Sequence, residues 1–97
     1  YMHRTGHWLG MDVHDVGSYR SPPASAEERP WRQLQAGMVL TIEPGLYVRP
    51  AADVAEKFWK IGIRIEDDAV VTETGCELIT RGVPVAADEI EALMRAR

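Results

Sequence analysis

Hydrophobic and polar residues alternate in two stretches of the chain, and such alternation is typical of a β-strand with one apolar face. The first stretch is residues 38–45, MVLTIEPG. Three apolar side chains share one face of this strand, those of Met38, Leu40 and Ile42. Glu43 lies on the opposite, more polar face, and Pro44 ends the strand directly after it.

The second alternating stretch is residues 62–68, GIRIEDD. Its apolar face carries three isoleucines, Ile61, Ile63 and Ile65. Arg64 and Glu66 lie on the other face. Residues 69–75 and 76–80 predict two further strands that turn at a glycine, so the pattern predicts mainly antiparallel strands.

The remaining segments complete an α+β unit. Residues 7–14 predict an extended segment in which Gly10 permits a bulge or a close backbone approach. Residues 18–37 contain three prolines and predict a loop, with a helical turn near 31–34. Residues 87–97 predict a helix with an apolar stripe at i, i+3 and i+4. A chain of 97 residues predicts one small domain with a modest core.

Composition narrows the classes of partner. Eleven basic and fifteen acidic residues give a net charge of −4, which predicts binding neither to nucleic acid nor to an anionic membrane surface. No apolar run approaches the ~20 residues that span a bilayer. The single cysteine, Cys76, lacks an internal disulfide partner and favours a cytoplasmic location. Because the chain opens at Tyr1 inside its most motif-rich stretch, we expect a fragment.

Two glutamates end the polar faces of their strands. If these strands are neighbours, Glu43 and Glu66 point into one space, and a histidine beside them completes an oxygen-rich donor set. Such a set favours manganese, magnesium or zinc. The alternative is that both carboxylates are solvated on an open sheet face. Arg64 either orients these carboxylates or forms a surface ion pair.

All three histidines lie within residues 3–14. Their spacing on a regular strand puts His7 and His14 on opposite faces unless Gly10 forms a bulge. Each histidine is either a functional group or a hydrogen-bonded structural residue. Two aspartates between and after them, Asp12 and Asp15, either orient the site or form a turn.

Three motifs, HWLGMDVHDVG, MVLTIEPGLYV and GIRIEDD, resemble the catalytic domain of bacterial aminopeptidase P, a branch of the pita-bread metallopeptidases. The resemblance runs almost end to end and implies that residues 1–97 form the C-terminal half of a pita-bread domain. It implies a metal-dependent aminopeptidase that releases the N-terminal residue from Xaa-Pro peptides.

The resemblance also implies roles for individual residues. Three are implied metal ligands: His7, Glu43 and Glu66. Four are implied catalytic residues: His3, His14, Arg64 and again Glu43, which moves protons. Two divalent metal ions, manganese before others, are implied as the cofactor that activates water for attack on the scissile carbonyl.

One departure from the family pattern is important. The dinuclear site of the family also needs two aspartates from the preceding half of the domain, and Asp12 and Asp15 do not match them. We therefore expect the chain alone to bind metal weakly and to be inactive. The expected partners are the missing N-terminal half, the peptide substrate and further copies of the same protein. Three alternatives remain open: an Xaa-Pro dipeptidase, a non-catalytic pita-bread binding module, and a fragment that associates through uncovered apolar strand faces.

Overall fold

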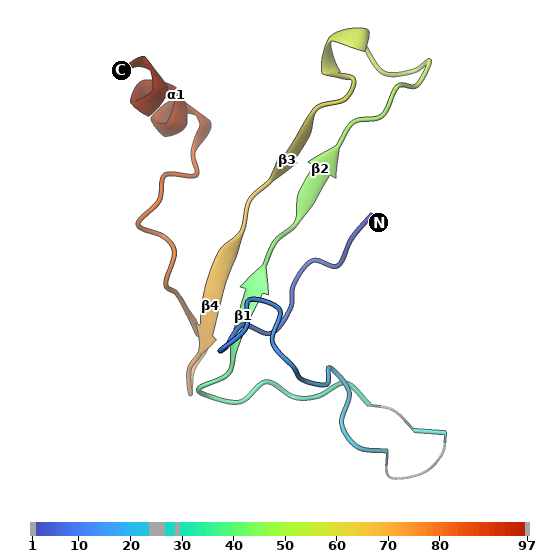
Figure 1. Cartoon of the computed structure of the whole chain (residues 1–97), viewed down its shortest axis with the longest axis vertical. Helices are drawn as coiled ribbons and strands as arrows, with labels where there is room; N and C mark the ends of the chain where they lie inside the picture. The colour runs from blue at the N-terminus through green and yellow to red at the C-terminus, as the bar shows by residue number, and fades with distance from the viewer. Residues whose placement is uncertain (1, 24–26, 29, 97) are drawn as a thin grey trace.

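The computed structural model describes residues 2–23, 27–28 and 30–96. These residues form five short strands, one 3-10 turn and one helix (Figure 1). The elements are β1 (Val39–Ile42), β2 (Gly45–Tyr47), η1 (Glu56–Phe58), β3 (Gly62–Arg64), β4 (Asp67–Val71), β5 (Cys76–Leu78) and α1 (Ala87–Arg95). β1, β4 and β5 form an antiparallel sheet in the order β1-β4-β5, and β2 pairs with β3.

The four strands β1 to β4 make one long antiparallel ribbon with a short break in its middle (Figure 1). Two residue pairs flank the break, Ile42 with Asp67 and Gly45 with Arg64. Because the register is the same on both sides, Glu43 falls opposite Glu66, and Pro44 falls opposite Ile65. Pro44 has no N–H to donate to the ladder, which accounts for the break. The strand predicted over 62–68 is therefore two strands.

The N-terminal segment runs antiparallel along the free edge of β1. Three backbone hydrogen bonds of 2.9 to 3.1 Å join residues 5–9 to residues 39–43. The extended segment predicted over 7–14 thus holds only as far as residue 9. Beyond it the chain bends, and the Asp15 N–H donates to the Trp8 carbonyl at 3.0 Å. A side chain at Gly10 would overlap the carboxylate of Asp15, so the predicted close approach is confirmed.

The loop over 18–37 contains no helix among its described residues, so the helical turn predicted near 31–34 is wrong. Trp31 instead forms an antiparallel bridge with Arg20. The Arg20 guanidinium lies over the indole, 3.3 Å from the ring centroid. Flanking backbone hydrogen bonds of 2.9 and 3.0 Å close this part of the loop.

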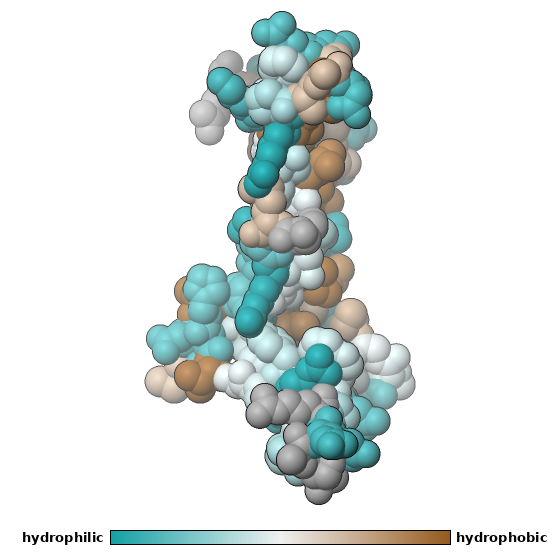
Figure 2. All heavy atoms as spheres, turned by 90° about the vertical axis from the view of Figure 1, so that its right-hand side faces the viewer, coloured by the Kyte–Doolittle hydropathy of each residue, from teal (hydrophilic) through white to brown (hydrophobic). Residues whose placement is uncertain are grey.

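Burial is divided between the two faces of the ribbon, with Thr41 and Glu43 on the polar face and Asp67, Ala69 and Val71 on the other. Thr41 and Glu43 are 2% and 7% exposed, whereas the buried hydrophobic residues among those described are Ala69 and Val71. The face of Ala69 and Val71 also carries apolar side chains that are 43–71% exposed: Ile42, Leu46, Ile61, Ile63 and Ile65. Figure 2 shows hydrophobic side chains gathered along one side of the ribbon. The predicted modest core is therefore almost missing.

The overall dimensions agree with this uncovered surface. The radius of gyration is 18.1 Å, whereas a compact chain of this length has about 13 Å. The accessible surface is 8233 Å², against about 5600 Å² for a folded monomer of this mass. A large apolar surface of this chain is thus available to be covered.

Helix α1 forms where a helix is predicted, although the last residue of the predicted range 87–97 lies outside the described residues. Its apolar stripe, Ile90, Leu93 and Met94, is 41–71% exposed. Figure 1 shows α1 standing apart from the strands. No helix in the described part of the chain is long and apolar enough to span a membrane.

Gly6 gives a test of the pairing between residues 5–9 and β1. A Cβ at Gly6 would collide with the backbone carbonyl of Thr41, which cannot move without shifting β1. We expect Gly6→Ala to lower the free energy of unfolding in urea by about 1–3 kcal/mol. The matched control is Gly75→Ala, because nothing lies within 4 Å of a Cβ at that position. Equal stability of the two variants would contradict this account of the segment.

Candidate metal centre

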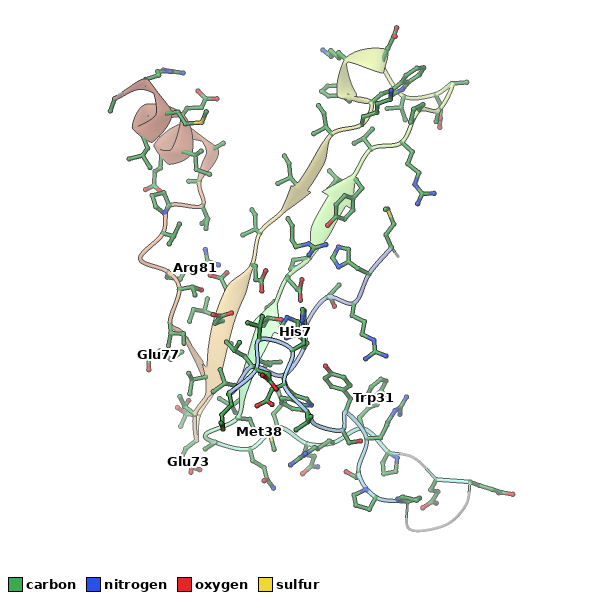
Figure 3. All side chains as sticks on the ribbon, viewed as in Figure 1. His7, Trp31, Met38, Glu73, Glu77 and Arg81 are labelled. Carbon is green, nitrogen blue, oxygen red and sulfur yellow. The ribbon has the colours of Figure 1, made fainter. Side chains whose placement is uncertain are left out.

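The three predicted metal ligands come together at the break in the ribbon. Single donor atoms of His7, Glu43 and Glu66 all lie within 4.8 Å of one another. Glu43 and Glu66 reach this point from opposite strands of the ribbon. His7, labelled in Figure 3, reaches it from the segment along the edge of β1. The predicted convergence of the two carboxylates is confirmed, and the reason is the common register.

The imidazole of His7 is oriented by its own backbone. Its Nδ1 lies 2.9 Å from the Trp8 carbonyl oxygen, which can only accept, so we assign the proton to Nδ1. In the neutral ring Nε2 then carries a lone pair, and it faces Glu43 Oε1 at 3.3 Å. Two acceptors at this distance repel each other unless a cation lies between them or the ring is protonated. This donor set therefore fits a divalent cation.

Glu43 is held by groups on both of its oxygens. The buried hydroxyl of Thr41 donates to Oε1 at 3.1 Å and accepts the His7 backbone N–H at 3.0 Å. Arg64 donates from Nη1 to Oε2 at 3.3 Å. Thr41 therefore sets the position of two of the three candidate ligands. Periodicity predicted its face but gave no sign of this role.

Tyr47 links Arg64 to His3. Arg64 Nε donates to the Tyr47 hydroxyl oxygen at 2.9 Å, and this hydroxyl lies 2.7 Å from His3 Nε2. The hydrogen bond to Tyr47, together with the charges of Glu43 and Glu66, raises the pKa of Arg64 above its usual value. The guanidinium thus stays charged. Tyr47 is not among the predicted site residues, and its sequence signal is its place on the same strand face as Glu43, two residues beyond Gly45.

The predicted catalytic histidines His3 and His14 and the predicted catalytic arginine Arg64 line a pocket together with His7 and Glu43. This pocket has a volume of about 350 Å³. The rings of His7 and His14 are 4.2 Å apart between centroids. On a regular strand these two residues would lie on opposite faces. The turn after residue 9 instead brings His14 back beside His7.

The two aspartates of the histidine segment are placed differently. The Asp15 carboxylate accepts the Val16 backbone N–H at 2.8 Å, and the backbone of the same residue closes the turn onto Trp8. Asp12 is exposed, and its carbonyl accepts the Gly10 N–H at 3.2 Å. These contacts are typical of turn-forming residues. Of the two alternatives for the aspartates, orienting the site or forming a turn, the structure favours the turn.

The fold and the cluster of two carboxylates with a histidine define a class of protein, the pita-bread metallopeptidases, and comparison with known families agrees. Residues 1–73 match the model of metallopeptidase family M24. The chain belongs to this family, whose members use divalent metal ions.

Individual relatives point to one branch of the family. The chain is 55% identical to the Xaa-Pro aminopeptidase of Escherichia coli strain K12 over 96 residues, which are 99% of this chain and 20% of that protein. The chain thus spans about a fifth of the length of the curated relatives that it matches first.

Solved structures show the same similarity. The structure of Pseudomonas aeruginosa aminopeptidase PepP matches with a TM-score of 0.84 and 58% identity, over 99% of this chain and 21% of that one. Zinc-substituted Escherichia coli aminopeptidase P in complex with product matches with a TM-score of 0.79 and 56% identity, over 98% and 20%. The predicted pita-bread fold class, with antiparallel strands and a C-terminal helix, is confirmed.

Thr41 gives a test of how the candidate metal centre is held. In Thr41→Val the His7 N–H and the Glu43 carboxylate lose a buried partner while the shape of the side chain is kept. We expect the free energy of unfolding to fall by about 1–3 kcal/mol and the affinity for Mn²⁺ to fall with it, measured by denaturation and by metal titration. Thr41→Ser keeps the hydroxyl and is the control. A valine variant that equals the serine variant in both measurements would refute the role of Thr41.

Proposed function

We propose that this chain is the C-terminal portion, residues 1–97, of the catalytic domain of a metal-dependent aminopeptidase that releases the N-terminal residue from Xaa-Pro peptides. The observation that carries this proposal is the convergence of His7, Glu43 and Glu66 within 4.8 Å. The likeness to Xaa-Pro aminopeptidases supports the substrate class. A cytoplasmic location and a homo-oligomer are further parts of the proposal.

In this proposal His7, Glu43 and Glu66 hold two divalent ions together with ligands from outside the chain. A bound ion supplies Lewis acidity to the scissile carbonyl and lowers the pKa of water for the attack. Two carboxylates and one imidazole, with no thiolate, favour manganese over softer metals. The structure of a relative has been solved in zinc-substituted form. A metal titration should therefore compare the affinity of the site for Zn²⁺ with its affinity for Mn²⁺.

The residues of this chain supply the proton transfers and the charge stabilisation. Glu43 receives the proton of the attacking water and delivers it to the leaving nitrogen, which must be protonated because an Xaa-Pro bond is a tertiary amide. His14, beside His7 in the pocket, donates to the carbonyl oxygen as negative charge develops there. His3 contacts the substrate from the same pocket. Arg64 keeps the Glu43 carboxylate oriented between these groups.

The first test uses the complete protein that contains this chain, loaded with Mn²⁺. We expect cleavage of Xaa-Pro-Yaa peptides after the first residue and loss of this activity when a chelator removes the metal. Glu43→Gln and Glu66→Gln are expected to lower kcat/KM by about 10²–10⁴-fold. Glu73→Gln, in the exposed turn after β4, is the matched control and should retain activity. Full activity of either site variant would refute the assigned roles.

The alternatives give different outcomes in the same experiment. An Xaa-Pro dipeptidase would cleave the dipeptide rapidly and leave the longer Xaa-Pro-Yaa peptide intact. A non-catalytic binding module would hold no metal and cleave neither peptide. Comparing the two peptide lengths and measuring bound metal on one preparation therefore separates all three functions.

A second test uses the 97-residue chain by itself. Because the resemblance assigns two further ligands to another part of the domain, we expect weak binding of Mn²⁺ and no measurable turnover. Uncovered apolar faces should also cause the chain to form oligomers. Metal titration, a peptidase assay and light scattering check these three expectations. Peptidase activity of the isolated chain on addition of Mn²⁺ would contradict the first.

A further inference from the structure

A second pocket adjoins the candidate metal centre. Its volume is about 810 Å³, and Arg20 and Trp31 line the part that it does not share with the pocket at the candidate metal centre. It shares four lining residues, His3, Arg4, Gly6 and Tyr19, with the pocket that two of the candidate metal ligands line. The two pockets are therefore neighbours on the surface, separated by no more than the side chains that they share.

The second pocket is positively charged, although the chain carries a net charge of −4. Its charged side chains are those of Arg4 and Arg20, and none of the described residues that line it is acidic. Charge of this sign suits an anion and disfavours the ammonium group of a peptide N-terminus.

Aromatic rings position the two guanidinium groups. Arg20 lies over the Trp31 ring at 3.3 Å, and Arg4 lies over the Tyr19 ring at 5.7 Å. Tyr19 is itself stacked on Trp8, with 5.5 Å between centroids and 12° between planes. Stacking engages the face of a guanidinium, whereas its N–H donors lie in the plane and match both oxygens of a carboxylate. Such stacked groups are ordered before a ligand binds.

The proposed reaction determines which part of a substrate reaches this pocket. An aminopeptidase cleaves after the first residue of its substrate. All the other residues of the peptide, beginning with the proline, therefore belong to the leaving product. We propose that Arg4 and Arg20 bind a carboxylate carried on the leaving side of the peptide, beyond the proline. This specificity rests on the proposed aminopeptidase function. The carboxylate comes either from the C-terminus of a short peptide or from an Asp or Glu side chain.

The test compares matched peptides with the complete, metal-loaded protein. Ala-Pro-Ala and Ala-Pro-Ala-Ala are each used as free acid and as C-terminal amide, and amides with Glu or Gln at the third position test the side-chain source. For at least one pair we expect kcat/KM to be about tenfold higher with the carboxylate, mainly through KM. Arg4→Gln and Arg20→Gln should bring this ratio close to one. Arg49→Gln removes an exposed charge outside the pocket and should keep the ratio.

A binding measurement separates this proposal from the peptidase proposal. Pro-Ala-Ala, as acid and as amide, is titrated into the metal-free protein while tryptophan fluorescence is followed. We expect about tenfold tighter binding of the acid and loss of this difference in the two arginine variants. This result would support the pocket even for a protein that cleaves nothing. Equal behaviour of acid and amide, and of Glu and Gln, in both assays would overturn the proposal.

Discussion

The structure depends on one constraint, which is that the ribbon keeps a single register across its break. This register sets Glu43 directly opposite Glu66, and like charges in such a pair are destabilising. Two donors of the chain, the Arg64 guanidinium and the Thr41 hydroxyl, are directed at Glu43 and offset part of this repulsion. Both carboxylates interact with the charge of Arg64, and a cation bound between them would remove the remaining repulsion. A slip by one residue would separate the two glutamates onto opposite faces.

The distribution of burial has the same origin. In most small domains apolar side chains are buried and polar ones exposed, but here the most buried large side chain is Thr41. The segment along the edge of β1 and the turn after residue 9 protect the site face. On the other face Asp67, Ala69 and Val71 of β4 are buried, whereas the isoleucines are 43–59% exposed. The site is thus organised by hydrogen bonds within this chain, whereas much of the apolar surface of its strands is exposed and contributes little hydrophobic stabilisation.

Sequence patterns predicted the features that depend on periodicity. Alternation placed Glu43, Arg64 and Glu66 on one side of their strands, and the helix stripe placed α1. Patterns failed where backbone donors or long-range pairing decide the structure. The missing N–H of Pro44 splits the ribbon into two parts, and the pairing of Trp31 with Arg20 replaces a local helical turn. Thr41 and Tyr47 went unnoticed because their roles arise from partners far away in the sequence. The metal-ligand roles rested on the resemblance, because alternation alone favoured a solvated sheet face.

The different surroundings of His3 and His7 explain how one segment presents two imidazoles of different chemistry. Each donates from Nδ1 to a carbonyl of the adjacent residue, Arg4 for His3 and Trp8 for His7. Each therefore presents Nε2 as an acceptor. For His3 this acceptor meets the Tyr47 hydroxyl, which can donate a hydrogen bond. For His7 it meets Glu43, which as a carboxylate has nothing to donate. Only the second arrangement calls for a cation, so the partner across the strand, rather than the residue type, distinguishes the candidate ligand from its neighbour.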